Sequence, residues 1–365
     1  MSLIIVESAF YKIECAFFLI YITKMKQYLH PDIEKLIVVG DIHGNFKEFF
    51  YKIRLNAKQE HPSIPREKLL DDASMSKIEP FLDRDVPSHI QAKFIDYGYE
   101  HKRYGKESIN DCIIVVAGDC GFGFNKLEYY HQIFNKYMSL LEQNNIYVYF
   151  VRGNHDDPSY FNNEIINYSH IKTIPDYSII QLQNKNVLCV GGATSIDRIW
   201  RKQEEERINK YKTHKKKLYW IDETIKYNQK QLDDIINNGI TIHGVISHSA
   251  PHFAFPNTKE GIKGWVRLDK KLNSDIKKER NTLTKIYEYL RDKEQPISFW
   301  CYGHFHMRRS ENHLNINFFA LSEMEFIDVE LENTSQRYNA IDDMILNWEI
   351  SPAVEIQPHE EQRNE

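Results

Sequence analysis

Five short segments, spread along the chain, carry side chains that bind hard or borderline metal ions. They supply Asp carboxylates, an Asn amide oxygen and His ring nitrogens, and each follows a run of apolar residues. The segments are Gly40-Asp41-Ile42-His43-Gly44, Gly118-Asp119, Gly153-Asn154-His155-Asp156, Ser247-His248 and Gly303-His304-Phe305-His306. One such segment would mean little, but five at the ends of expected strands predict metal-assisted chemistry on a phosphate ester.

The spacing of the first three segments suits different ligand roles. Asp41 and His43 lie two residues apart on a turn, so a carboxylate and an imidazole can hold the same divalent ion. Asp119 emerges at the end of another strand, and one carboxylate can bridge two cations about 3.5–4 Å apart. Asn154 offers a neutral oxygen that suits a hard cation.

Histidines complete the expected ligand set. His248 follows Ser247 at a strand end. A lone histidine in such a place is usually an ordinary core residue, so its predicted metal role depends on the other four segments. His304 and His306, two residues apart on a turn, can diverge toward two different ions. His252, four residues after His248, is expected to have a different role.

The elements that must position these side chains follow from the apolar pattern. Runs rich in Val, Ile, Phe and Tyr predict strands at 36–39, 112–117, 146–151, 187–190, 244–246, 297–302, 316–321 and 326–331. Helical spacing predicts helices at 46–54, 127–142, 222–238 and 274–291. This alternation indicates an α/β layered domain, in which ligands bind at the carboxyl ends of strands.

Length and composition limit the possible classes. The chain has 365 residues, of which 42% are hydrophobic, enough for one large α/β domain with insertions or for two domains. Its formal net charge is -5, which gives no support to a general nucleic-acid-binding surface but leaves room for a local basic groove. The five cysteines form no C-x-x-C pair, which predicts buried free thiols and a reducing cytoplasm. Cys120, beside Asp119, is expected to be a small residue in a tight loop rather than a metal-site thiol.

The ends of the chain and three inserted stretches are less regular. We expect an N-terminal extension over residues 1–30, a main domain over 31–350 and a disordered tail over 351–365. The apolar stretch at 3–22 contains Glu7, Lys12 and Glu14, which argues against a secretory signal or a membrane span. It is either a packed element or an extension upstream of Met25.

Insertions are expected at about 55–110 and 194–220, with a shorter loop at 251–272. All three leave strand ends on the metal side, so a lid or a substrate-selecting rim is one interpretation. Solvated surface structure is the other, and it is favoured for the charge runs at 201–207 and 215–217.

Taken in order, the five segments resemble the pattern of the calcineurin-like metallophosphoesterase superfamily. That pattern is D-x-H, then G-D, then G-N-H-D/E, then a lone H, then G-H-x-H, and every element is present over residues 40–306. The resemblance implies an α/β fold, a four-layer α/β/β/α sandwich of two mixed β-sheets flanked by helices. It also implies hydrolysis of a phosphomonoester or phosphodiester by a hydroxide that bridges two divalent ions. Mn²⁺ is the first expectation, with Fe or Zn²⁺ as alternatives, because a mixed set of oxygen and nitrogen ligands discriminates only weakly among these metals.

The resemblance also implies individual roles. The ligands of the first ion would be Asp41, His43 and His306, and Asp119 would bridge. The ligands of the second ion would be Asn154, His248 and His304. His155 would contact the phosphate and assist the leaving group, and Asp156 would orient His155 by a hydrogen bond.

One branch of the superfamily is disfavoured. Protein Ser/Thr phosphatases carry a phosphate-binding Arg in G-D-x-V-D-R-G, whereas this chain continues from Asp119 with Cys-Gly-Phe-Gly. Another cation must therefore steady the phosphate, and four residues are candidates by position alone: Arg152, Arg198, Arg308 and His252. The expected substrate is a nucleotide, a small phosphoester or a nucleic acid. No membrane and no obligate protein partner are expected. A non-catalytic metal-binding scaffold of the same fold is the rival hypothesis.

Overall fold

The computed structural model describes residues 25–57, 109–212, 215–256, 260–329 and 331. Most of the expected N-terminal extension, most of the insertion at 55–110 and the whole expected tail at 351–365 lie outside these residues, as does Cys15. In the part of the chain that the structure describes, no helix has both the length and the apolar character needed to cross a bilayer.

Two mixed β-sheets form the centre of the fold. In the five-stranded sheet the order is β12 (Phe326–Val329), β2 (Lys35–Val39), β3 (Cys112–Val116), β4 (Ile146–Phe150) and β5 (Ile171–Thr173). In the seven-stranded sheet it is β1 (Gln27–His30), β6 (Ser178–Leu182), β7 (Lys185–Val190), β8 (Gly244–Ser247), β9 (Phe299–Tyr302), β11 (Ile316–Ala320) and β10 (Arg309–His313).

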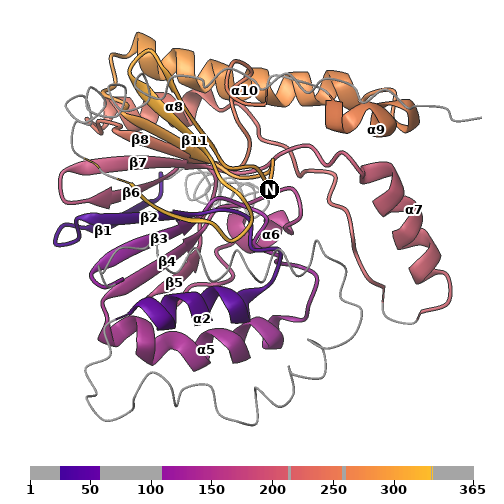
Figure 1. Ribbon diagram of the computed structural model, residues 1–365, viewed down its shortest axis with the longest axis horizontal. Coiled ribbons are helices and arrows are strands. Elements are labelled where there is room, and N and C mark those ends of the chain that lie inside the picture. The colour runs from indigo at the N-terminus through magenta and orange to yellow at the C-terminus, as the bar shows by residue number, and fades with distance from the viewer. Residues whose placement is uncertain (1–24, 58–108, 213–214, 257–259, 330, 332–365) are drawn as a thin grey trace, which may run out of the picture. The chain divides into compact units, whose positions relative to one another are not determined.

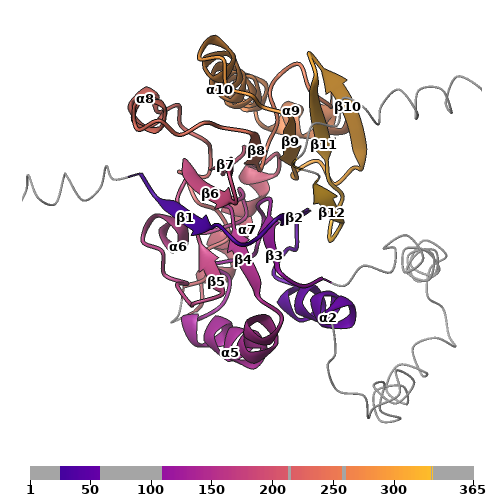
Figure 2. The same cartoon turned by 90° about the vertical axis from the view of Figure 1, so that its left-hand side faces the viewer.

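Helices cover the outer face of each sheet. The five-stranded sheet is covered by α2 (Phe46–Asn56) and α5 (Leu127–Gln143), and the seven-stranded sheet by α8 (Gln229–Asn237) and α10 (Leu272–Asp292). Figures 1 and 2 show the resulting order of layers: helices, sheet, sheet, helices. The predicted four-layer α/β/β/α sandwich is therefore confirmed.

Three hydrophobic clusters hold these layers together. The middle cluster joins the two sheets, with Val38 and Val115 from one sheet packed with Val187 and Ile246 from the other. The outer clusters join each sheet to its helices. Because the central strands are buried on both faces, they appear in the sequence as continuous apolar runs rather than as alternating patterns.

The direction of the strands gathers the five polar segments. In one sheet β2, β3 and β4 are parallel neighbours, and in the other β7, β8 and β9 are parallel neighbours. The carboxyl ends of β2, β3, β4, β8 and β9 lead directly into the loops that carry the predicted ligands. The parallel register thus places residues far apart in sequence at one edge of the sandwich.

Several elements differ from the sequence prediction. The eight predicted strands are present with ends shifted by a few residues, but β1, β5, β6 and β10 were not predicted. Gln27 in β1 pairs with Ile179 in β6, so the sheet includes residues that we had placed in the N-terminal extension. The helix predicted at 222–238 begins only at Gln229, because the Asn228 side chain caps it by accepting from the N–H of Gln231.

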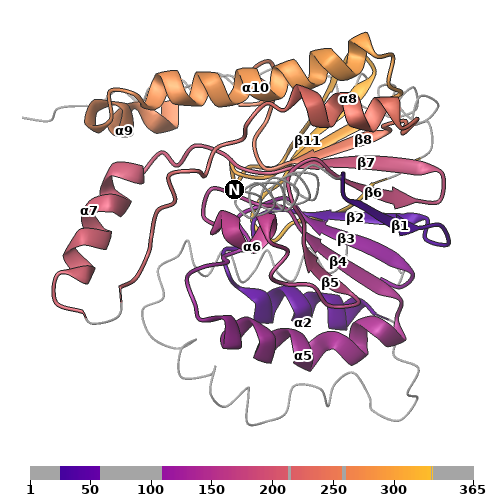
Figure 3. The ribbon, with the colours of Figure 1, turned by 180° about the vertical axis from the view of Figure 1, so that it is seen from behind.

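The insertion at 194–220 contains the twelve-residue helix α7 (Arg198–Asn209). It lies beside the layers, at the same end of the molecule as α6 (Pro158–Asn162), as Figures 1 and 3 show. The loop predicted at 251–272 contains a short 3-10 turn (Glu260–Ile262) and α9 (Lys263–Leu268).

The aromatic packing under the five-stranded sheet gives a stability prediction. Phe134 of α5 is fully buried among Phe46, Phe50 and Phe150. We expect Phe134→Ala to lower the free energy of unfolding by about 3–5 kcal/mol, because it leaves a cavity between helix and sheet. Leu268→Ala, at a position that is 67% exposed, is the matched control. Urea denaturation measures both, and equal losses in the two variants would contradict this packing.

Candidate metal centre

Four of the predicted ligands converge at the carboxyl ends of β2, β3 and β9. Asp41, His43, Asp119 and His306 each offer one ligand atom, and these atoms all lie within 4.8 Å of one another. His306 Nε2 is 2.9 Å from Asp41 Oδ2, and the Nε2 atoms of His43 and His306 are 3.1 Å apart. Two carboxylates, both buried, and two imidazoles thus face a common point. This is a donor set that fits a divalent cation.

A second set of atoms meets on the other side of Asp119. His248 Nε2 lies 2.9 Å from Asn154 Oδ1 and 3.2 Å from Asp119 Oδ1. His248 Nδ1 is 2.7 Å from the Ala117 carbonyl oxygen, to which it donates, so that Nε2 faces the two side-chain oxygens. The four side chains Asp119, Asn154, His248 and Asp41 are all buried.

The charge balance around His248 favours a cation. Burial lowers its pKa, but the carboxylates of Asp119 and Asp41 outweigh that effect and raise the pKa to about 10. A positive charge is therefore stabilised beside Nε2, and a divalent ion can supply it in place of the proton.

His304 lies next to this second set. Its ring centroid is 5.0 Å from that of His248, and its backbone N–H donates to Asp41 Oδ1 at 3.0 Å. Burial and the positive charge of His248 hold the pKa of His304 well below its usual range. Its imidazole is therefore neutral, which is the form that binds metals.

The backbone is constrained where these side chains leave it. Four of the seven expected ligands have left-handed φ angles: His43 (46°), Asp119 (44°), His304 (69°) and His306 (52°). Such conformations cost energy in non-glycine residues and persist only where the surroundings enforce them, often at functional sites. Gly153 supports this packing, because a Cβ atom there would lie 2.0 Å from the Asp119 nitrogen.

The role predicted for Asp156 is wrong in detail. We expected its carboxylate to hydrogen-bond His155, but both oxygens are directed beneath the loops, where they accept four backbone N–H groups at 2.7–3.0 Å. The donors are Cys120, Gly121, Phe122 and Gly153. Because Asp156 is completely buried, these donors replace the water molecules that would otherwise hydrogen-bond its carboxylate. The same bonds tie the loop after the second segment to the third segment. Burial, followed by the charge of Asp119, raises the pKa of Asp156 to about 6.

His155 is held against the cluster of predicted ligands by its main chain. Its backbone N–H donates to Asp119 Oδ1 at 2.8 Å, and its ring Nδ1 lies 3.7 Å from Asp119 Oδ2. The partner of the ring is a residue that the sequence did not single out. Arg201 Nη2 lies 2.8 Å from His155 Nε2.

The four cations named by position have other partners. Arg152 is bound by Asp176 and by the Glu223 carbonyl oxygen, and Arg198 by Asp269 and Asp275. Arg308 pairs with Glu325, and His252 bonds to Thr284. Their positions beside the motifs did not reveal these contacts, since each partner comes from a distant part of the chain.

Two acidic residues near the cluster were also missed. Glu323 Oε1 lies 3.0 Å from His306 Nδ1 and 3.6 Å from His43 Nε2, so it can fix the orientation of the His306 ring. Glu223 contacts the predicted ligand Asn154 through Ser195. Its Oε2 accepts from the Ser195 hydroxyl at 2.6 Å, and the Ser195 oxygen accepts from Asn154 Nδ2 at 2.9 Å. This chain of bonds turns the Asn154 oxygen toward His248. No motif marks either residue.

The buried thiols behave as predicted for the cysteines that the structure describes. Cys112, Cys120, Cys189 and Cys301 are free and buried. The Cys120 thiol donates to the Val151 carbonyl oxygen, and burial raises its pKa well above the usual value. It is therefore an inert packing residue in the loop, as expected.

Comparison with known protein families agrees with this architecture. The model of the calcineurin-like phosphoesterase family matches residues 34–308, and the chain belongs to that family. The matched range includes all five segments. A search of curated proteins finds no match. Family and ligand cluster together fit a metal-dependent phosphoesterase.

The burial of Glu223 predicts how the stability of the protein depends on pH. Burial raises the pKa of Glu223 to about 8, against an ordinary value of 4.5. The folded state therefore binds this proton more tightly than the unfolded state. The resulting stabilisation is complete below pH 4.5 and is lost as the pH rises through about 8. We expect Glu223→Gln to lose about 2–4 kcal/mol less stability than the wild type between pH 5 and pH 8.5.

Urea denaturation at the two pH values measures this difference. Glu206→Gln, at an exposed position of α7, is the control and should retain the wild-type pH dependence. If Glu223→Gln showed the same pH dependence as the wild type, Glu223 would not be the titrating group.

Proposed function

We propose that this protein hydrolyses a phosphomonoester or phosphodiester at a site that holds two divalent metal ions. The observation that carries the proposal is the position of Asp119 between two sets of ligand atoms. On one side are the atoms of Asp41, His43 and His306, and on the other those of Asn154 and His248. A single carboxylate shared by two such sets is the arrangement of two-metal hydrolytic sites.

These positions support the following proposed ligand roles. Asp41, His43 and His306 would hold one ion, Asn154, His248 and His304 the other, and Asp119 both. Bound ions would lower the pKa of a water molecule and neutralise charge on the phosphate oxygens. The oxygen and nitrogen donors suit Mn²⁺, which we propose first, as well as Fe or Zn²⁺.

His155 is the proposed catalytic side chain. Its ring stands beside the ligand cluster and is partly exposed, so a bound phosphate ester can reach it. There it would contact the phosphate and donate a proton to the leaving oxygen. Asp156 contributes indirectly, because its four backbone contacts hold the loop that carries His155.

The rival hypotheses have less support. A non-catalytic scaffold would be expected to have lost ligands or His155, and all are present in this chain. A protein phosphatase would be expected to carry an Arg four residues after Asp119, where Gly123 stands. We therefore propose a nucleotide, small phosphoester or nucleic-acid substrate, in the cytoplasm, without a membrane or an obligate protein partner.

Metal content tests the shared role of Asp119. Chelated protein reloaded with Mn²⁺ is expected to hold about two ions per chain, measured by plasma mass spectrometry. Asp119→Asn should lower occupancy at both sites because it removes the common carboxylate charge. Asp328→Asn, on strand β12 and away from the cluster, is the control. Retention of both ions by Asp119→Asn would refute the bridging role.

Turnover tests the reaction itself. The Mn²⁺-loaded protein is screened on p-nitrophenyl phosphate, bis-p-nitrophenyl phosphate, cyclic nucleotides and short nucleic acids. We expect hydrolysis of at least one ester, and a 10²–10⁴-fold lower kcat in His155→Ala with unchanged metal content. His313→Ala, on β10, serves as the control. An absence of turnover with two ions bound would rule out the enzyme, and full activity of His155→Ala would refute the role of His155.

A further inference from the structure

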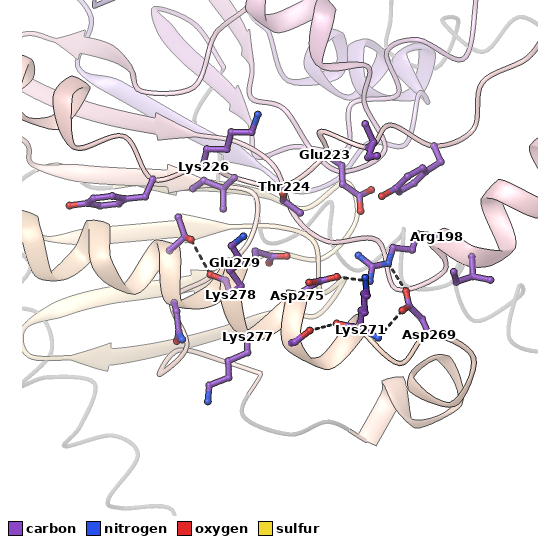
Figure 4. Close-up of a pocket in the computed structure, with 18 of the residues that line it drawn as sticks. Arg198, Glu223, Thr224, Lys226, Asp269, Lys271, Asp275, Lys277, Lys278 and Glu279 are labelled. Atoms are coloured by element: carbon purple, nitrogen blue, oxygen red, sulfur yellow. Dashed lines mark hydrogen bonds and ion pairs between the residues drawn. The ribbon is translucent and has the colours of Figure 1, made fainter.

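Helix α7 is held to the rest of the protein by polar contacts. It has no buried residue, and a hollow of about 1020 Å³ lies between it and α10. Figure 4 shows Arg198, in its first turn, between Asp269 and Asp275, with N–O distances of 2.5 and 2.6 Å. Farther along, Glu205 accepts the backbone N–H of Leu218 at 2.7 Å. These contacts fix a helix that packing alone would not hold.

One turn beyond the beginning of α7, Arg201 is directed at the site. Its Nε donates to Asp197 Oδ1 at 2.7 Å, and Nη1 lies 3.4 Å from the Leu218 carbonyl oxygen. Nη2 lies 2.8 Å from Nε2 and 3.2 Å from Nδ1 of His155. The side chain is only 14% exposed. Asp197 and Leu218 thus set the guanidinium plane and leave Nη2 facing the metal cluster.

The pairing of Arg201 with His155 has at most one acceptor. A guanidinium only donates, and a neutral imidazole ring offers one acceptor nitrogen and keeps one N–H donor. The cluster beside them is where a phosphate would be attacked. Donors from two separate elements that face one position at such a site are suited to an anion that accepts from both.

We propose that Arg201 binds the phosphoryl oxygens of the substrate beside His155, and that it favours a phosphomonoester over a phosphodiester. This inference rests on the proposed function. Arg201 would also take the place of the phosphate-binding Arg that is absent after Asp119. It comes from the insertion at 194–220 instead of from the loop after β3. Arg201 is then a substrate-binding residue, and Asp197 is the residue that positions it.

The preference for a monoester follows from charge. Near pH 7 a phosphomonoester carries about 1.5–2 negative charges, because its second pKa is about 6. A diester carries a single negative charge and has one more oxygen blocked by an ester bond. The fork of a guanidinium pairs most strongly with an anion that offers two free, charged oxygens. Loss of Arg201 should therefore weaken monoester binding more than diester binding.

The test compares Arg201→Ala, Arg201→Lys and the control Arg207→Ala. Arg207 lies on the same helix, is exposed and pairs with Glu204, so it reports on any general effect on α7. The first readout is the Kd of inorganic phosphate for Mn²⁺-loaded protein, by titration calorimetry. We expect at least a tenfold weaker Kd in Arg201→Ala, an intermediate value in Arg201→Lys and no change in Arg207→Ala, all with equal metal content.

The second readout is kcat/KM on a monoester and on a diester. For Arg201→Ala we expect about a 100-fold loss on p-nitrophenyl phosphate and a loss at least tenfold smaller on bis-p-nitrophenyl phosphate. A wild-type Kd for phosphate in Arg201→Ala would overturn the binding role. Equal losses on both esters would overturn the preference. If Arg201→Ala does not fold, Arg201→Lys decides, because it keeps the charge but lacks the fork.

These readouts separate this inference from the function on which it rests. A wild-type protein that binds phosphate through Arg201 but turns over no ester would refute the esterase and leave Arg201 as an anion-binding residue. Turnover that is unaffected in Arg201→Ala and Arg201→Lys, with unchanged phosphate affinity, would refute the role of Arg201 and leave the esterase intact.

Discussion

The buried carboxylate of Asp119 is the feature on which the site depends. Burial alone would raise its pKa, but the electrostatic attraction of His155 and His248 outweighs that effect and holds the pKa well below its usual range. A buried negative charge is stable only with compensating partners. Oδ1 faces the His155 N–H at 2.8 Å and His248 at 3.2 Å, so the chains after β3, β4 and β8 are all tied to one side chain. Under the proposed function, cations bound beside this carboxylate would complete that compensation.

The fold keeps Asp119 in place mainly through the backbone. Left-handed turns bring ligand side chains off the strand ends, and Asp156 gathers four N–H groups from two of these loops. Strain in the turns is offset by the two sheets, whose buried strands fix where each loop begins. The rigid sandwich therefore supports a site made almost wholly of loop residues.

The sequence was sufficient to predict those features of the fold and the site that depend on the local pattern of residues. The central strands were visible because burial on both faces makes them continuously apolar, and the ligand types were visible because each lies just after a strand. Strands β5 and β6 were missed because they lie at or near sheet edges and are short or mixed in polarity. The sequence could not show where a carboxylate points. Asp156 follows His155 directly, yet buried backbone N–H groups bind its carboxylate and turn it away from the His155 ring. Arg201 and Glu223 depend on contacts across tens of residues, and the charge run around Arg201 resembles solvated surface.

The same contrast explains how specificity arises on this scaffold. The proposed metal ligands sit on loops whose ends are fixed by the sheets, so they have little freedom to change with the substrate. Arg201 sits on a helix with no buried residue, whose position rests on the ion pairs of Arg198 and on Asp197. Polar contacts of this kind tolerate substitution far better than a packed core. The proposed chemistry of phosphate-ester cleavage would thus reside in the rigid part of the structure. Recognition of the particular ester would, on our proposal, reside in α7, whose polar contacts can change without disturbing the carboxylate at the centre.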